Sequence, residues 1–414
     1  MRKIIASIDF GSDTIKIVVG EFIKDKFLVL AAISHQSKGI KKGVIVDLDA
    51  TTSSLQEALK EIETRIGLEV KKVILNIPSY YANFELGSGQ TTISNETGFV
   101  SGNDIVRAIQ GSVYNQIPEN MELINVVPVE FTIDDSERVE NPMSMTAKKL
   151  GVKTVLITTP KKNVYPVLNV IENLGLQASD IILGSMSDYY TFNNPEMDKV
   201  SGVIINVGHE TTSVSIFNKG IIVNTEILEI GNVNIDNDIS FIYKVNSNDA
   251  KILKENLALS HIRNADAAHF EEVTNKLNEN IKINQYEITE IVASRVDEIL
   301  KIAKKQINLL TKKEISYIII TGGITELKDF SLTVESIFGK SATVGLMNTL
   351  GVRSGIFSCS LGMINFFNNK MKMRNKDYCI FNDIQLEDLS GEGKKINIDN
   401  DSILGKIFGY FFDN

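Results

Sequence analysis

The sequence KIIASIDFGSDTIKIVVG, residues 3–20, contains two apolar runs on either side of a polar turn that includes Gly11. An apolar strand, a glycine turn and a second apolar strand form the pattern of a β-hairpin. A third run of the same character, residues 27–33, follows the polar residues 24–26. The segment therefore predicts a meander of three antiparallel strands at the start of the chain.

The same pattern occurs a second time in residues 202–216, which read GVIINVGHETTSVSI. The spacing of Asp9, Gly11 and Thr14 is repeated there by Asn206, Gly208 and Thr211. A third strand, residues 220–230, again follows. One glycine hairpin is common in proteins, but two copies in register, each opening a meander, predict a duplicated domain.

The residues after the first meander favour mixed α/β layers. Residues 49–66 have helical spacing and stop before Gly67, a suitable residue just past a helix end. Residues 73–77 form a buried-strand candidate. The stretch 80–158 then interrupts the first half with strands of its own, and it is predicted to be an inserted α+β subdomain.

A phosphate or ribose site is expected where an apolar strand, residues 315–320, ends in Thr321-Gly322-Gly323 before a helix over residues 325–338. Free backbone N–H groups point outward at such a helix start. The two hairpin turns, facing each other across a cleft, would donate further hydrogen bonds from Ser12, Thr14, Thr211 and Thr212. Asp9 is placed to orient a hydrated Mg²⁺.

The composition and charge of the chain limit the partners and the cellular location that are expected. The 414 residues carry a net charge of −9, so a nucleic acid is not expected, because phosphate backbones bind basic faces. No apolar run reaches the roughly 18 residues that span a bilayer. The first residues turn acidic too early for a signal peptide. Cys359 and Cys379 give neither a disulfide framework nor metal-ligand spacing, so the protein is expected to be cytosolic.

The end of the chain has its own pattern. Residues 371–401 are polar and in large part acidic, and they are predicted to be a flexible linker. Residues 402–414 are predicted to form an amphipathic helix, whose membrane-facing side chains are Ile403, Leu404, Ile407, Phe408, Phe411 and Phe412. A helix that completes the core is the alternative, but it would need no long tether. A short helix with one lysine should bind a membrane surface weakly unless many copies act together.

The order of these motifs resembles the actin, sugar-kinase and heat-shock ATPase superfamily, and over nearly the whole chain it resembles bacterial FtsA. The segments that carry the second resemblance are KGIKKGVIVD at 38–47, VPVEFTID at 127–134, Asn141-Pro142-Met143, Gly231-Asn232, Asn248-Asp249-Ala250 and SCSLG at 358–362. The resemblance implies duplicated actin-like (ribonuclease H-like) domains that flank a nucleotide cleft, with the inserted α+β subdomain and the C-terminal amphipathic helix.

The resemblance also implies site residues and partners. ATP with Mg²⁺ would be bound by Asp9, Gly11, Ser12, Asp13, Thr14, Lys16, Asn206, Gly208, Thr211, Thr212, Gly231, Lys254, Gly322 and Gly323. The implied role is a cell-division scaffold that self-associates into actin-like filaments. It would tether FtsZ filaments to the cytoplasmic face of the membrane at the division site and recruit other division proteins.

The second hairpin departs from the family pattern Asp-x-Gly-Gly-Gly-Thr. Asn206 lacks a carboxylate, and His209 and Glu210 place side chains where bare backbone should approach phosphate. Lys251 stands where a glutamate is expected. The hypothesis is that the fold is retained while nucleotide binding and hydrolysis are weak or lost. The alternative, in which Glu210 turns outward and binding survives, stays open.

A partner-binding helix is expected at residues 287–310, where Arg295 falls inside an apolar arc. By resemblance, Arg295 would contact the C-terminal tail of FtsZ, assisted by Lys301 and Lys304. The alternative is an arginine that pairs with a nearby acid, and a solvated face is the simpler interpretation of the lysines.

The expected boundaries follow from these patterns. They are 1–79 and 159–198 for the first actin-like half, 80–158 for the insert, 199–346 for the second half with a helical partner-binding subdomain at 232–312, 347–370 for a closing helix region, 371–401 for the linker and 402–414 for the membrane helix.

A small-molecule kinase and a PilM-like pilus scaffold remain alternatives. The kinase lacks a convincing catalytic base and neither alternative accounts for the amphipathic end. A heat-shock chaperone is disfavoured because no substrate-binding domain follows.

Overall fold

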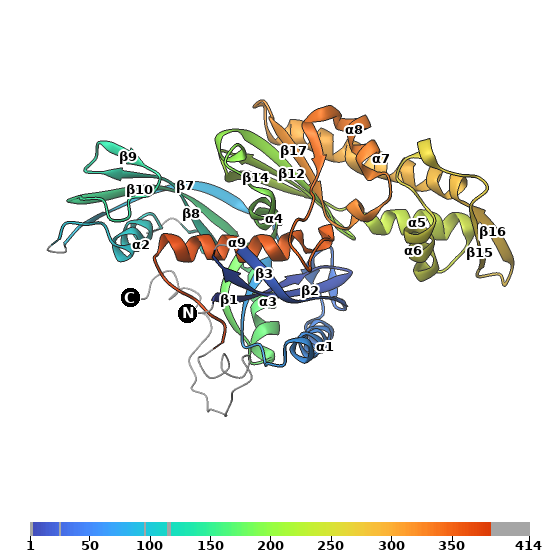
Figure 1. Ribbon diagram of the computed structural model, residues 1–414, viewed down its shortest axis with the longest axis horizontal. Helices are drawn as coiled ribbons and strands as arrows, with labels where there is room; N and C mark the ends of the chain where they lie inside the picture. Colours follow the sequence, from blue (N-terminus) through green and yellow to red (C-terminus); the bar gives the residue numbers. More distant parts are fainter. Residues whose placement is uncertain (1–2, 25, 95–96, 114–116, 382–414) are drawn as a thin grey trace. The chain divides into compact units, whose positions relative to one another are not determined.

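The computed structural model describes residues 3–24, 26–94, 97–113 and 117–381 (Figure 1). They form two compact units. Among the described residues, unit 1 contains the chain up to Thr191, residues 349–352 and residues 359–381, and unit 2 contains Phe192–Asn348 and Arg353–Ser358. The predicted membrane helix at 402–414 lies outside the described residues. Within the described part of the chain, no helix is long and apolar enough to cross a membrane.

Unit 1 is built on a five-stranded sheet in the order β11-β6-β1-β2-β3. The strands are β1 (Lys3–Phe10), β2 (Thr14–Ile23), β3 (Lys26–Gln36), β6 (Lys72–Ile77) and β11 (Gln177–Leu183). The first three form the predicted antiparallel meander, and β6 and β11 extend the sheet in parallel with β1. A short ribbon, β4 (Ile40–Lys41) and β5 (Val44–Ile45), follows the meander.

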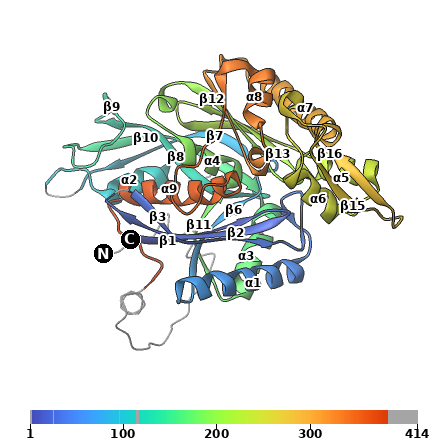
Figure 2. The same cartoon turned by 45° about the vertical axis from the view of Figure 1, so that its right-hand side comes forward.

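Helices cover both faces of this sheet. In Figures 1 and 2, α1 (Leu48–Ile66) and α3 (Lys161–Asn173) lie on one face, and α9 (Ser358–Met373) lies on the other. The helix α4 (Gly184–Phe192) follows β11 directly. The boundaries of α1 follow from its sequence, because the Asp47 side chain accepts a hydrogen bond from the Ala50 amide and Gly67 adopts φ +77°, which favours glycine.

The insert expected in the first half is confirmed as a small α+β subdomain. Its described residues form four strands in the order β7-β10-β8-β9 and one helix. Their bounds are β7 (Asn83–Thr92), α2 (Gly102–Gly111), β8 (Met121–Ile133), β9 (Glu137–Val139) and β10 (Lys149–Pro160). Ile105 and Ala108 of α2 pack with Phe131, Leu150 and Val152 in a core of its own.

Unit 2 repeats the strand plan of unit 1. Its sheet has the order β14-β13-β12-β17-β18. The strands are β12 (Ser201–Val207), β13 (Thr212–Asn218), β14 (Ile221–Leu228), β17 (Tyr317–Thr321) and β18 (Ala342–Val344). A meander is again extended by two parallel strands. The pairing is the same in both copies, since Asp9 faces Lys16 as Asn206 faces Ser213. The predicted duplication is confirmed.

Helices and one ribbon complete unit 2. They are α5 (Asn232–Tyr243), α6 (Ser247–Asn256), β15 (Phe270–Thr274), β16 (Asn280–Asn284), α7 (Gln285–Leu310) and α8 (Phe330–Phe338), with short 3-10 turns at Met197–Lys199, Ile262–Asn264, Gly323–Glu326, Gly339–Ser341 and Gly355–Phe357. The apolar arc of α7, including Ile288, Val292 and Val296, is buried in the core.

Two expected segments differ from the structure. The helix expected over 325–338 is a 3-10 turn followed by α8, because Asp329 adopts φ +62° and interrupts the helix. The linker expected from residue 371 is wrong for residues 371–381. The helix α9 continues to Met373, the Ile380 amide donates to the Ile4 carbonyl, and residues 378–381 are buried. Their apolar side chains, Tyr-Cys-Ile-Phe, explain the packing.

Candidate functional site: two glycine hairpin turns and a glycine loop

The turn of the first hairpin is closed by a hydrogen bond from the Gly11 amide to the Thr14 carbonyl, 3.1 Å. A Cβ at Gly11 would lie 2.7 Å from the Thr14 carbonyl oxygen of the backbone, so the position has no room for a side chain. The Ser12 hydroxyl accepts a hydrogen bond from the Gly43 amide at 2.8 Å, and the Ser37 amide donates to the Asp13 carbonyl. The turn is thus fixed to the β4–β5 ribbon.

Asp9 lies near the carboxyl end of β1 and is buried. Its Oδ1 atom accepts a hydrogen bond from the Asn76 Nδ2 atom at 2.7 Å, and its Oδ2 atom lies 3.3 Å from the Lys16 Nζ atom. The Asn76 Oδ1 atom in turn accepts from the Phe10 amide at 2.8 Å. The carboxylate is therefore oriented by a neighbouring strand and balanced by one lysine.

Asn76 was not among the residues selected from the sequence. It lies at the carboxyl end of β6, which runs parallel to β1. Parallel strands that end at the same sheet edge commonly position ligand-binding groups there. A polar residue near the end of the predicted strand 73–77 was the signal that could have identified it.

The negative charge of Asp9 also reaches the start of α9. Cys359 is buried there, and burial raises the pKa of its thiol well above the ordinary value. The nearby carboxylates of Asp9 and Asp188 raise the pKa further, whereas Lys16 opposes them. Thiolate chemistry at neutral pH is therefore disfavoured at Cys359.

The turn of the second hairpin is closed in the same way, by a hydrogen bond from the Gly208 amide to the Thr211 carbonyl at 2.8 Å. The Thr212 hydroxyl is buried and donates to the Ile230 carbonyl at 2.7 Å. Because the Thr212 hydroxyl proton is already used in this hydrogen bond to the Ile230 backbone, the side chain mainly stabilises the turn.

The start of α5 packs on this second turn. The Asn232 amide donates to the Gly208 carbonyl at 3.0 Å, and the Val233 amide donates to the His209 carbonyl at 2.8 Å. A Cβ on Gly231 would lie 2.6 Å from the His209 carbonyl oxygen, so glycine permits this close approach. Two of the N–H groups at the α5 N-terminus are thereby satisfied by the protein itself.

The glycine loop after β17 lies beside the second turn. Gly322 has φ +94°, and a Cβ there would lie 2.4 Å from the Val207 carbonyl oxygen and 2.5 Å from the Asn206 Oδ1 atom. Asn206 pairs with Thr321 across the parallel strands β12 and β17. Unit 2 therefore brings together five of the predicted nucleotide-binding residues: Asn206, Gly208, Gly231, Gly322 and Gly323. These positions offer close backbone approach at the carboxyl end of parallel strands, the arrangement that suits a phosphate or a ribose.

Lys254 has a different environment from the one expected of a nucleotide-binding residue. Its Nζ atom lies 2.6 Å from the Asp236 Oδ1 atom, and both side chains are buried between α5 and α6. A buried charge needs a partner, and here the partner is a carboxylate of the protein. The position of Lys254 therefore favours a structural role.

The residues of α7 that were expected to bind a partner also form ion pairs or hydrogen bonds within the protein. The Arg295 guanidinium donates to both carboxylate oxygens of Asp238, at 2.6 and 2.8 Å, and also to Glu298. The hydrogen bond to Asp238 is the main cause that raises the pKa of Arg295. Lys301 pairs with Asp297 at 2.7 Å, and Lys304 donates to the Ile337 carbonyl. The geometry favours the alternative in which Arg295 pairs with a nearby acid.

In the part of the chain that the structure describes, no group of three or more His, Cys, Asp or Glu side chains is arranged to hold a metal ion. Mg²⁺ beside nucleotides is usually held by one or two carboxylates together with water and phosphate oxygens, and Asp9 would be such a carboxylate.

Two copies of one glycine-hairpin sheet, with a glycine loop at the strand ends of the second copy, define an actin-like protein. The fold is similar to MreB5 of Spiroplasma citri bound to ADP, with a TM-score of 0.54, 12% identity and coverage of 89% of this chain and 97% of that one. It is also similar to the PilM–PilN type IV pilus biogenesis complex, with a TM-score of 0.55, 14% identity and coverage of 87% and 97%.

Two family models indicate which family of actin-like proteins this chain is similar to. The model described as "SHS2 domain inserted in FTSA" matches residues 82–158, and the model described as "Cell division protein FtsA" matches residues 203–362. The chain is 25% identical to the cell division protein FtsA of Bacillus subtilis over 367 residues, which is 88% of this chain and 83% of that protein. The chain belongs to the FtsA family of cell division proteins. These matches favour cell division over the pilus and kinase alternatives.

Proposed function

We propose that this FtsA-family protein is a membrane-anchored, actin-like scaffold of cell division. It would tether FtsZ filaments to the cytoplasmic face of the membrane at the division site, assemble into actin-like filaments and recruit other division proteins. The observation that carries the proposal is the combination of the duplicated hairpin sheet with the FtsA-type insert on one chain. The amphipathic pattern of residues 402–414 supports the membrane role.

We further propose that ATP with Mg²⁺ is a structural or regulatory ligand that binds weakly and is hydrolysed slowly or not at all. The turns at Gly11 and Gly208 and the Gly322-Gly323 loop fit phosphate and ribose groups, and Asp9 fits a hydrated Mg²⁺. Three features oppose tight binding: the amide of Asn206 replaces a carboxylate, Glu210 adds a negative charge to the turn, and turn carbonyls satisfy the first amides of α5.

The FtsZ tail is proposed to bind the helical part of unit 2 around α7. Arg295 is the residue proposed to bind the FtsZ tail, and its ion pair with Asp238 indicates how it would bind an acidic group. An acidic group of the tail would replace the Asp238 carboxylate on the guanidinium, because the planar fork of arginine donates two parallel hydrogen bonds to one carboxylate at a time. Lys301 and Lys304 would assist through charge alone.

The first test is co-sedimentation with anionic liposomes, comparing the full chain with a chain that ends at Asp401. The tether predicts that the full chain pellets with the liposomes and the shortened chain stays in solution. If both stay in solution, the membrane role is overturned while the actin-like fold is unaffected. If both pellet equally, membrane binding resides elsewhere in the chain and the proposed role of residues 402–414 is wrong.

A further inference from the structure

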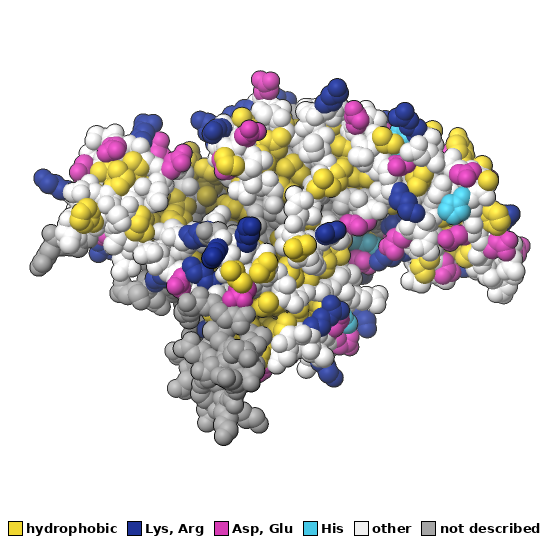
Figure 3. Space-filling model, in the orientation of Figure 1, with side chains coloured by type: hydrophobic (Ala, Val, Ile, Leu, Met, Phe, Trp, Pro, Cys, Tyr) yellow, Lys and Arg dark blue, Asp and Glu magenta, His cyan; other side chains and the backbone are white. Residues whose placement is uncertain are grey.

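The hairpin of β2 and β3 carries an exposed apolar patch near its turn, which no role described above uses. The patch consists of Ile23 of β2 with Leu28 and Leu30 of β3, which are 47%, 41% and 40% exposed. Leu28 faces Glu21 across the two strands, and Ile23 lies two positions after Glu21, so the side chains of Leu28 and Ile23 share one face of the sheet. Leu30 is the extra residue of a β-bulge beside them. In Figure 3, hydrophobic side chains (yellow) are exposed over the strands of this sheet, which Figure 1 labels in the same orientation.

The patch begins where α1 stops covering the sheet. Along β3, the His35 ring lies 3.1 Å from the Glu57 carboxylate of α1, and Arg65 in the last turn of α1 donates to the Ala32 carbonyl. From Leu30 to the hairpin turn, the helix no longer covers this strand. β3 is also an edge strand of its sheet, and native proteins usually cover an apolar edge. We therefore expect a further segment to cover the patch.

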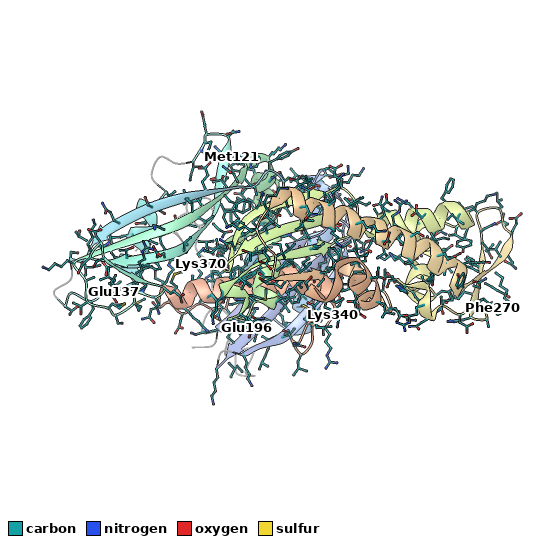
Figure 4. All side chains as sticks on the ribbon, turned by 90° about the horizontal axis from the view of Figure 1, so that it is seen from above. Met121, Glu137, Glu196, Phe270, Lys340 and Lys370 are labelled. Atoms are coloured by element: carbon teal, nitrogen blue, oxygen red, sulfur yellow. The ribbon has the colours of Figure 1, made fainter. Side chains whose placement is uncertain are left out.

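The described chain ends beside the same end of the sheet. Lys370, labelled in Figure 4, fixes the last turns of α9 to β11 through hydrogen bonds of 3.0 and 2.8 Å to both oxygens of the Asp180 carboxylate. Beyond the helix, the Ile380 amide donates to the Ile4 carbonyl at 3.0 Å. The predicted tether therefore leaves unit 1 from a fixed point beside the start of β1.

The strand register indicates how far this point lies from the patch. Ile380 is bonded to Ile4, and Ile4 faces Glu21 across β1 and β2. Glu21 in turn faces Leu28 across β2 and β3. Hydrogen-bonded neighbours in a sheet lie about 4.8 Å apart, so three steps place Leu28 about 14 Å from residue 380. Residues 382–401 of the predicted linker have an r.m.s. reach of roughly 25 Å on flexible-chain scaling, which is enough to bring residues 402–414 to the patch.

The chemistry of residues 402–414 also fits the patch. Their predicted apolar face consists of Ile403, Leu404, Ile407, Phe408, Phe411 and Phe412. Contact with the aliphatic patch would remove apolar surface of both partners from water, which is favourable in proportion to the area removed. A flexible linker of this length holds its end at an effective concentration on the order of 1 mM. A contact with an intrinsic Kd of about 0.1 mM would therefore be occupied about ten to one.

We propose that the patch of Ile23, Leu28 and Leu30 is a docking site for residues 402–414 of the same chain when the protein is away from the membrane. The inference rests on the proposed membrane function of those residues. The same apolar side chains contact either the patch or the lipid, so the docked and the membrane-bound states exclude each other. A docked fraction of about ten to one weakens membrane binding about tenfold, because only the free fraction can insert.

The first test uses the full chain without lipid. The sequence has no tryptophan, so Phe408→Trp places a unique fluorescent reporter in the predicted helix. Docking predicts a blue-shifted emission that is protected from quenching by acrylamide, and the added substitutions I23T/L28T should give the emission of an indole in water. Threonine suits a β-strand, so the melting temperature should stay the same. The matched control L86T/V223T removes two exposed apolar side chains from the edge strands β7 and β14 and should leave the emission unchanged.

The second test measures binding of the full chain, without the reporter, to vesicles of phosphatidylcholine and phosphatidylglycerol. I23T/L28T should bind about tenfold more tightly than the natural chain, because docking no longer competes with insertion. L86T/V223T should bind as the natural chain does. A patch that itself contacted lipid would give the opposite sign, since I23T/L28T would then weaken binding, and that result would overturn the proposal.

The emission of the reporter separates the other possible occupants. An emission typical of water in the chain with the natural patch would mean that residues 402–414 do not dock. A blue shift that persists in I23T/L28T would place their docking site elsewhere, and a blue shift that appears only at high protein concentration would mean docking on a second copy. Each of these results would overturn the proposal. If neither the natural chain nor I23T/L28T binds vesicles, the proposed membrane function has failed, and the emission without lipid still decides whether the patch is a docking site.

Discussion

The Asp9 carboxylate accepts a 2.7 Å hydrogen bond from the side-chain amide of Asn76, which also accepts a bond from the Phe10 backbone. One amide therefore fixes both the orientation of the acid and the start of the first glycine turn. Because Asp9 is buried, loss of this partner would leave a charged group with Lys16 alone.

Replacement of Asn76 by alanine should therefore lower the free energy of unfolding by about 2–3 kcal/mol, because hydrogen bonds to buried charged groups have this magnitude. The loss is measurable by thermal or urea unfolding. Asn369→Ala, an exposed position on α9, is the control and should change stability by less than about 0.5 kcal/mol. Equal stability of the two variants would show that the amide does not support Asp9.

Lys254 provides a test between a structural and a nucleotide-binding role. Lys254→Met removes one partner of a buried ion pair and should destabilise the protein by about 3–5 kcal/mol. The double variant Lys254→Met/Asp236→Leu should recover most of this loss, because no buried charge is left unpaired. If the single variant instead keeps its stability and loses only ATP affinity in calorimetry, Lys254 belongs to the nucleotide site.

Glu210 should weaken ATP binding through its charge. Glu210→Gly removes a carboxylate from the second turn, and Asn206→Asp restores one where Mg²⁺ would be bound. The combined variant should bind Mg²⁺-ATP about tenfold more tightly than the natural chain, a change of roughly 1.4 kcal/mol. Calorimetry with and without Mg²⁺ measures this. Tight, Mg²⁺-dependent binding by the natural chain would contradict the proposed weakness of the site.

Arg295 and Asp238 should affect binding of the FtsZ tail with opposite signs. Arg295→Ala removes the proposed anchor and should weaken binding of an FtsZ C-terminal tail peptide. Asp238→Asn removes the competing carboxylate and should strengthen it by about tenfold, since a charge-assisted pair of this kind contributes on the order of 1–2 kcal/mol. If both variants lose stability and neither changes peptide affinity, the pair is purely structural.

Cys359 gives a prediction for pH. Burial and nearby carboxylates raise the pKa of its thiol in the folded protein, so the unfolded chain ionises first as the pH rises. The contribution of Cys359 to stability is complete below the unfolded pKa of about 8.5 and is lost progressively above it. The natural chain should therefore lose more stability than Cys359→Ala between neutral and strongly alkaline pH. Parallel curves in urea unfolding would contradict this effect.

The repeated hairpins could be predicted from the sequence, but the residue that a given polar side chain contacts could not. The two glycine turns could be recognised because hairpins depend on local spacing, and the structure has the same register in both. Asn76 was missed because its contact with Asp9 depends on which parallel strand lies beside β1. Nothing in the spacing of a single strand contains that information.

The ion-pair partners of the charged residues could not be predicted from the sequence for the same reason. A helical pattern placed Arg295 on its helix, and the family resemblance selected Lys254. Their partners Asp238 and Asp236 lie on α5, and only the packing of α5 against α7 and α6 pairs them. The end of α9 shows a related limit. Residues 371–381 are polar enough on average to suggest a linker, yet four consecutive side chains at 378–381 are buried.

The two turns have a consequence for protein engineering. Each is closed by a backbone bond between a glycine amide and a threonine carbonyl, so neither closure depends on the side chains between them. The loop sequences are therefore modular. Grafting Gly-Ser-Asp-Thr from the first turn onto residues 208–211 would give both turns the same loop sequence and keep both closures, while Asn206 would still differ from Asp9.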